Sequence, residues 1–242
     1  MTDLLLVIAA ALWGAAAGAF LPRAGYRFSA PSGEPWRDGC PQGHPVPGWL
    51  GRARCTSCMT AYGSGVAPLS LATALVCAAL GAATGTRPEL GVWLLLAPLG
   101  VLLAVVDFRV QRLPDPLTLP LAAAALVLLG VVAQVPEHTG EWLTALYGAL
   151  ALGGGYFVLF LINPSGMGFG DVKLALGMGA VLGWYGWSTL MLGTFAGFLL
   201  GALYGGALVV VRRAGRKTAI PFGPFLISGA FLGLLIGAYC SV

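Results

Sequence analysis

Charged residues are scarce in this chain of 242 residues: Asp, Glu, Lys and Arg together make up 9% of it, whereas 58% is hydrophobic. The mean hydropathy is +0.86, which excludes an ordinary water-soluble domain of this length. The sequence also lacks a phosphate-binding Gly-Lys-Ser/Thr loop, and it has no Gly-x-Ser-x-Gly segment of a serine hydrolase. The composition therefore predicts an all-α polytopic membrane protein.

Long apolar segments fill most of the chain. A helix needs about 20 apolar residues to cross the hydrocarbon core of a bilayer. The sixth apolar segment is too short to cross unaided, and the first lacks the basic start of a signal peptide, so we interpret it as a span. The eight predicted transmembrane helices are 4–20, 68–84, 90–106, 117–135, 142–162, 172–184, 188–211 and 220–239.

The basic residues predict the orientation, because Lys and Arg near span ends are retained on the cytoplasmic side. With eight spans, all of the 13 Lys and Arg residues except Arg87 fall on one side. Both termini then lie outside, and the loop 211–219, whose basic residues fall at 212–217, is predicted to be a cytoplasmic headgroup anchor. The net charge of +4 reflects this topology and does not indicate a nucleic-acid partner. Four acidic residues also fall outside: Asp3, Glu89, Glu137 and Glu141.

One long segment between spans, residues 21–67, is predicted to form a small cytoplasmic loop domain between a first helix at 1–20 and a seven-helix membrane domain at 68–242. It contains Cys-x3-His followed by Cys-x2-Cys. Three thiolates and an imidazole complete a tetrahedral zinc set, and a loop with few apolar residues has few other means of holding a fold. The alternative is a surface histidine and free thiols in a reducing compartment. The candidate ligands are Cys40, His44, Cys55 and Cys58.

Some other residues have a simpler interpretation. Cys77 and Cys240, in or at the end of spans, are predicted to be small apolar fillers. His138 is predicted to be solvated in an outer loop. The small-x3-small pairs Gly14 with Gly18 and Gly201 with Gly205 predict close helix packing.

Two aspartates stand at the ends of apolar spans, on the side predicted to be cytoplasmic. Asp107 ends the third span, and Asp171 follows Gly168-Phe169-Gly170 at the start of the sixth. An ionised Asp near the bilayer centre costs roughly 2.5 to 3.5 kcal/mol on insertion scales, so such residues usually face a protein interior or a cavity. The glycines allow Asp171 to lie at a helix N-terminus, where the helix dipole favours its anion.

Two carboxylates within hydrogen-bond distance share one proton and titrate as a unit. The ionised member takes a proton from water, the protonated member donates to a scissile carbonyl oxygen, and the roles then reverse. The alternatives for Asp107 and Asp171 are a helix cap, an interfacial carboxylate or an ion pathway. For Asp115, after Pro114, capping of the fourth span is the better interpretation, and Lys173 is expected to contact headgroups.

Three motifs resemble those of the type IV prepilin peptidases, in the same order along the chain. The first is Asp107 followed by Leu-Pro-Asp at 113–115 and Leu-Thr at 117–118; the others are Gly-Phe-Gly-Asp-Val-Lys-Leu at 168–174 and Ile-Pro-Phe-Gly-Pro-Phe-Leu at 220–226. The way the first span runs into its loop, residues 18–27, is also similar. Gly-x-Gly-Asp is shared with presenilin-like proteases, but the other two motifs have no place in those proteins.

The resemblance implies an intramembrane aspartic endopeptidase of the bacterial inner membrane, with Asp107 and Asp171 as its catalytic pair. It would cleave the short basic leader of prepilin or pseudopilin precursors after a Gly at the cytoplasmic face, for type IV pili or type II secretion. Proteolysis would need no cofactor, and zinc in the loop would be structural. The motif residues expected to support the pair are Gly168, Gly170, Lys173, Pro114 and Asp115.

The chain departs from the family pattern at two positions. Many members have two Cys-x2-Cys pairs in the loop, whereas here His44 stands in for one Cys, and Pro22 replaces the common Asn after Phe-Leu. Both features are associated with members that also methylate the new N-terminus with S-adenosylmethionine. That second activity, and its cofactor, are therefore expected only if methyl transfer is retained. The sequence leaves the oligomeric state open.

Two other functions stay open. A transporter or ion pathway would use the two aspartates to bind a cation or a proton. A scaffold for pilus assembly would bind its partners through the zinc loop.

Overall fold

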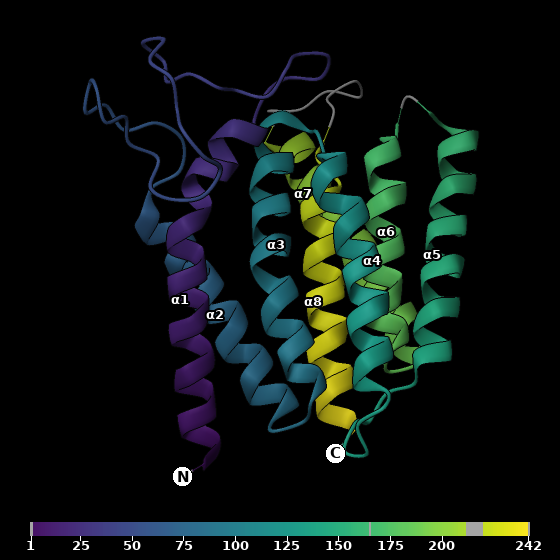
Figure 1. Ribbon diagram of the computed structural model, residues 1–242. Helices are drawn as coiled ribbons and strands as arrows, with labels where there is room; N and C mark the ends of the chain where they lie inside the picture. The colour runs from purple at the N-terminus through teal and green to yellow at the C-terminus, as the bar shows by residue number, and fades with distance from the viewer. Residues whose placement is uncertain (1, 165, 212–219, 242) are drawn as a thin grey trace. The chain divides into compact units, whose positions relative to one another are not determined.

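The computed structural model describes residues 2–164, 166–211 and 220–241. Its described part is all-helical, with only two isolated β-bridges. Seven helices are long and apolar enough to cross a membrane, by length and composition. The helices, drawn in Figure 1, are α1 (Thr2–Phe28), α2 (Val66–Thr84), α3 (Glu89–Val110), α4 (Asp115–Val132), α5 (Trp142–Ile162), α6 (Phe169–Gly183), α7 (Trp187–Val210) and α8 (Gly223–Cys240). The predicted polytopic membrane fold is confirmed. The basic segment 212–217, predicted to anchor headgroups, lies outside the described residues.

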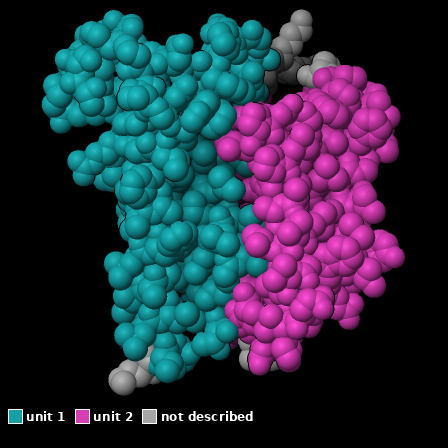
Figure 2. Space-filling view, viewed as in Figure 1, with its two compact units in different colours: residues 1–86, 90–112 teal, residues 87–89, 113–242 magenta. Residues whose placement is uncertain are grey.

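The chain divides into two compact units, coloured separately in Figure 2. Unit 1 consists of residues 1–86 and 90–112 and contains α1, α2, most of α3 and the long loop between α1 and α2. Unit 2 consists of residues 87–89 and 113–242 and contains α4 to α8.

In unit 1, α1 and α2 pack closely along a strip of small residues. A Cβ atom on Gly14 would lie 2.5 Å from the carbonyl oxygen of Thr73, and one on Gly18 would lie 2.7 Å from that of Leu69. Only glycine allows the two helices this separation, so the predicted packing role of Gly14 and Gly18 is confirmed. Cys77 is fully buried, as expected of an apolar filler.

Helix α1 continues two turns beyond the predicted end of the first span, to Phe28. Pro22 lies inside it and has no backbone N–H to donate. Gly51 of the loop bonds the helix on both sides of this proline: its N–H donates to the carbonyl of Phe20 (2.8 Å), and its carbonyl accepts from the N–H of Arg23 (3.0 Å). The loop thus holds the backbone around Pro22, and residues 21–28 are helical.

Unit 2 is organised around the short helix α6, which contacts each of α4, α5, α7 and α8. A helix that is apolar on all sides is expected to be buried in this way. Its 15 residues confirm that the sixth predicted span is too short to cross unaided. Close approach of α5 requires glycine, since a Cβ atom on Gly148 would lie 2.5 Å from the carbonyl oxygen of Gly179.

The predicted packing pair Gly201 and Gly205 is not the closest part of α7. A Cβ atom on Gly201 would be in ordinary contact with Phe225, 3.5 Å away. The tight approach of α7 to α8 lies nearer the start of α7, where a Cβ atom on Gly233 would lie 2.8 Å from the Cα of Gly193. Small-x3-small spacing is common in this chain, so spacing alone did not identify the contact.

Two residues of unit 2 predicted to lie in outer loops are buried or half-buried, and one of them belongs to a buried polar cluster. Glu89 is fully buried, and its Oε1 accepts hydrogen bonds from Thr139 (2.7 Å) and Tyr185 (3.3 Å), with Nε of Arg87 3.9 Å away. His138 is half-buried beside the Trp184 ring, which corrects its predicted solvation. Cys240 is also exposed rather than a buried filler.

Candidate functional site

Asp107 lies in the last turn of α3 in unit 1, with 4% of its surface exposed. Its carbonyl accepts the N–H of Gln111 at 2.8 Å. Gln111 has φ +51°, the left-handed conformation that usually favours glycine after a helix. The backbone therefore turns sharply one turn after the aspartate, and the buried carboxyl stands at the end of its helix, as predicted.

Asp171 lies in the first turn of α6 in unit 2, with 7% of its surface exposed. Its Oδ2 accepts the N–H of Gly168 at 3.2 Å, while its own N–H donates to the carbonyl of Gly168 at 3.0 Å. This reciprocal pairing satisfies polar groups at the helix start, and the helix dipole favours the carboxylate there. The predicted position of Asp171 at a helix N-terminus is confirmed.

The Leu-Pro-Asp part of the first motif meets the second motif within unit 2. A Cβ atom on Gly170 would lie 2.9 Å from the Cβ of Leu113, so the start of α6 packs directly on the Leu-Pro-Asp segment. Pro114 precedes α4, and its carbonyl accepts the N–H of Leu117 and of Thr118. The Leu-Pro-Asp segment and the second motif thus pack together around the helix start that carries Asp171.

Asp115 and Lys173 have roles other than those predicted. The Asp115 side chain makes no capping hydrogen bond, because α4 begins at Asp115 itself and Pro114 occupies the cap position. Instead, Oδ2 of Asp115 lies 2.7 Å from Nζ of Lys173, which also lies 4.9 Å from the centre of the Phe169 ring. Lys173 is therefore paired within the protein rather than directed only at headgroups.

Sequence reasoning missed Tyr156, a buried residue of α5 that is 2% exposed. Its ring packs on Phe198 and on Phe222, which belongs to the third motif. Its hydroxyl lies within electrostatic range of Asp171 and has no hydrogen-bond partner among the described residues. The only signal in the sequence is a tyrosine in an otherwise apolar span, which also fits ordinary packing.

The four candidate zinc ligands come together in the loop of unit 1, with their ligand atoms all within 4.8 Å of one another. Sγ of Cys40 lies 3.6 Å from Nδ1 of His44 and 3.8 Å from Sγ of Cys58. Zinc bonds of about 2.3 Å to sulfur and about 2.0 Å to nitrogen put tetrahedral ligand atoms roughly 3.5 to 3.8 Å apart. The two printed separations match this spacing, and the set as a whole is close enough to hold a zinc ion.

The local backbone explains how the ligands meet. Tight turns bring the N–H of Cys40 to the carbonyl of His44 (2.8 Å) and the N–H of Cys55 to the carbonyl of Thr60 (3.0 Å). Tyr26 of α1 packs on Tyr62 of the loop, and its hydroxyl donates to the carbonyl of Gly39. The ligand set is thus held between two turns and the end of α1.

The thiols differ in their acidity. Burial raises the pKa of Cys40, whereas hydrogen bonds with Thr60 lower the pKa of Cys58 to about 6. A thiolate is the form that binds metal. The lowered pKa favours the thiolate of Cys58, and zinc would stabilise the deprotonated form of Cys40.

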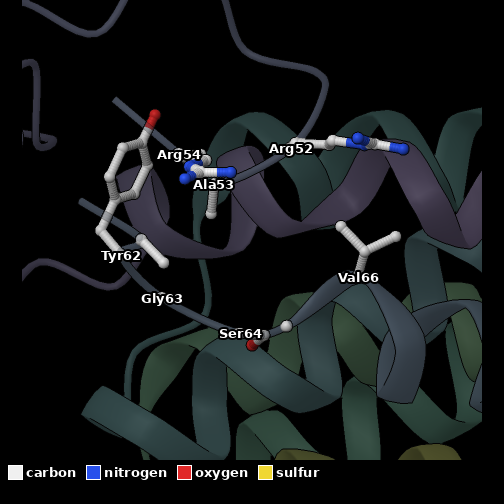
Figure 3. A pocket seen from close by; sticks show the side chains of 9 residues that line it. Arg52, Ala53, Arg54, Tyr62, Gly63, Ser64 and Val66 are labelled. Carbon is white, nitrogen blue, oxygen red and sulfur yellow. The ribbon is translucent and has the colours of Figure 1, made fainter. Parts of the chain in front are cut away.

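A pocket of about 360 Å³ opens beside this loop (Figure 3). Its lining comes from residues 52–54 and 61–66, with Arg52 and Arg54 as the basic members. The lining includes neither an aspartate nor any of the four candidate ligands. This pocket is a hollow of the loop and supplies none of the residues predicted for catalysis or metal binding.

Comparisons with known proteins follow the motifs. A family model described as the type IV leader peptidase family matches residues 94–206, which include Asp107 and Asp171. Proteins called prepilin leader peptidase/N-methyltransferase are similar over most of the chain. The one from Pseudomonas aeruginosa is 32% identical over 82% of this chain and 71% of its own length, and the one from Aeromonas salmonicida is 34% identical over 78% and 64%. That from Bacillus subtilis is 31% identical over 77% and 72%. No solved structure matches the chain.

Proposed function

The chain belongs to the type IV leader peptidase family, and from this premise we propose that it cleaves the leader from prepilin or pseudopilin precursors, with Asp107 and Asp171 as the catalytic pair. The observation that carries the assignment is the burial of two carboxylates at helix ends, 4% and 7% exposed, inside the segment matched by the family. Buried carboxylates in a membrane protein are costly and mark functional sites.

The proposed chemistry is hydrolysis by a carboxylate pair that shares one proton. The ionised carboxylate takes a proton from the attacking water while the protonated one donates to the scissile carbonyl oxygen. The proton then passes to the leaving amine as the tetrahedral intermediate collapses, which restores the pair. Each aspartate is fixed by its own helix end, and the packed motif around Gly170 and Leu113 holds Asp171 in place.

The orientation proposed from the basic residues places this chemistry at the cytoplasmic face of a bacterial inner membrane, with both termini outside. A precursor with a basic leader inside and an apolar helix in the bilayer presents its junction at that level. Peptide bonds within a membrane helix are protected by its own hydrogen bonds. Cleavage at the end of the helix needs little unwinding.

The proposed role of zinc is structural, with the ion held by the four clustered ligands of the loop. The loop has a small core, and bound metal would add folding free energy by joining its two turns. The chemistry proposed for the aspartates does not involve this metal.

The relatives' names include N-methyltransferase, but the residues do not reproduce the pattern associated with that activity. Pro22 lies buried inside α1 and offers no side-chain amide where the family commonly has Asn. His44 occupies a Cys position in the proposed zinc set. The proposal is therefore limited to proteolysis, and no step is assigned to S-adenosylmethionine.

Coexpression with candidate precursors, followed by mass measurement of their N-termini, tests this function. Cleavage after the leader Gly by the wild type, lost in Asp107→Ala and in Asp171→Ala, is the expected result. A methylated product would be heavier by one CH2, because a methyl group replaces a hydrogen, and would add methyl transfer to the proposed function. Cation or proton flux in proteoliposomes that needs both aspartates, without cleavage of any precursor, would instead establish a transporter.

A further inference from the structure

Arg112 joins the end of α3 to the loop that carries the zinc ligands. Its Nη1 donates to three loop carbonyls, those of Ala30 (3.3 Å), Pro31 (2.8 Å) and Glu34 (3.0 Å). The guanidinium carbon also lies 3.9 Å from the centre of the Trp36 ring, a cation–π contact. Such a set of charge-assisted bonds fixes one side chain against a whole loop segment. All of these residues belong to unit 1.

On its other side, Arg112 is coupled through the backbone to Asp107. It follows Gln111, which has a left-handed backbone and whose N–H bonds the carbonyl of Asp107 at 2.8 Å. A left-handed non-glycine residue is strained and persists only where its surroundings hold it. The contacts of Arg112 with the loop supply such a restraint immediately beyond the helix end.

Aromatic contacts extend the connection toward the zinc ligands. The Trp36 ring meets Phe28 edge-on at 5.2 Å, and Phe28 stacks on Trp49 at 4.6 Å. Arg27 lies over Trp49 and donates to the carbonyl of Gly48 at 2.7 Å. Trp49 and Gly48 lie in the segment between His44 and Cys55. A continuous set of contacts therefore runs from the metal-ligand loop to the helix end that carries Asp107.

We propose that Arg112 is a positioning residue through which the folded state of the zinc loop controls the placement of Asp107, and hence the rate of leader cleavage. The proposal rests on the proposed function, because Asp107 must be catalytic for the rate to respond. It predicts that metal bound in the loop changes the rate of leader cleavage, although the metal takes no part in the chemistry. A displacement of about 1 Å at a catalytic group can cost up to 100-fold in rate.

The test uses the full chain in proteoliposomes with a precursor that the wild type cleaves. Arg112→Ala and Trp36→Ala should each lower kcat about tenfold and leave KM unchanged, whereas Arg112→Lys should recover part of the rate. The double variant should be no slower than the slower single variant, since both changes break the same connection. Arg109→Ala is the matched control, because Arg109 is exposed in the last turn of the same helix. Wild-type kcat in Arg112→Ala, or a hundredfold loss in the double variant, would overturn the proposal.

Chelation separates coupling from a general loss of structure. Removal of zinc should slow the wild type about tenfold but should not slow Arg112→Ala further. An equal response of the two proteins would show that the loop acts by another route.

Hydrogen exchange gives a readout that does not depend on activity. In the wild type, chelation should increase exchange of the amides from Asp107 to Arg112, and Arg112→Ala should show this exchange with zinc present. If these amides respond as expected but no precursor is cleaved, the connection stands and the proposed function fails. If they are unchanged in Arg112→Ala, the connection itself is refuted.

Discussion

Gly170 and Leu113 lie so close together that a Cβ atom on Gly170 would be 2.9 Å from the Cβ of Leu113. This contact joins the segment before Asp171 to the Leu-Pro-Asp segment at the start of α4. It explains why a glycine is needed at this position. The residue that must be glycine therefore lies directly before the proposed catalytic residue Asp171.

Gly170→Ala is therefore expected to lower the free energy of unfolding by about 1 to 3 kcal/mol, the usual cost of overpacking. It should also slow precursor cleavage, because the helix start that holds Asp171 must move. Thermal unfolding in detergent and a cleavage assay would measure the two effects. Gly154→Ala is a matched control, since a Cβ atom there would meet nothing within 4 Å. Leu113→Gly, which removes the Cβ that would lie 2.9 Å away, should partly rescue Gly170→Ala; a double variant no better than the single would show that Leu113 is not the obstacle.

Asp107→Asn and Asp171→Asn are each expected to reduce cleavage by at least about 1,000-fold, because neither can carry the proton that the pair exchanges. Helix content by circular dichroism should stay at the wild-type value. Asp115→Asn serves as the control, since its carboxyl is 58% exposed and pairs with Lys173. Retained activity in either of the first two variants would remove that residue from the catalytic pair.

The ion pair between Asp115 and Lys173 should contribute little to stability. The pair is short, at 2.7 Å, but the exposed carboxylate is screened by water. A double-mutant cycle with Asp115→Asn and Lys173→Met should give a coupling of about 0.2 to 1 kcal/mol. A coupling of several kcal/mol would mean that the pair is a main support of the Asp171 helix.

Protein purified without chelator should contain about one equivalent of zinc. Cys55→Ser should lose most of it, whereas His44→Cys should keep it, because four thiolates also form a tetrahedral zinc site. Cys77→Ser, which changes a buried thiol between α1 and α2, should leave the metal content unchanged. Metal analysis would decide, and a protein free of zinc with its four ligands intact would exclude the site.

Local patterns were enough to predict several parts of this protein. Long apolar segments gave the helices, because burial in lipid requires a minimum length of apolar chain. Gly168 and Gly170 predicted that Asp171 stands at a helix start, since glycines disrupt the preceding helix and the dipole favours a carboxylate there. The spacing of Cys40, His44, Cys55 and Cys58 predicted a cluster, because four ligands of this kind match one metal.

Other features depended on residues far apart in the chain. The extension of α1 to Phe28 needs backbone partners from Gly51, and the pairing of Lys173 needs Asp115 on another helix. Local propensity predicts neither of these contacts, since each depends on how distant segments pack together. The sequence by itself determined the membrane-spanning class, the candidate aspartates and the metal-ligand set. Only the tertiary structure decided which glycines lie at helix contacts, which charges are paired and that Arg112 ties the loop to the helix of Asp107, because those choices are made by contacts between distant segments.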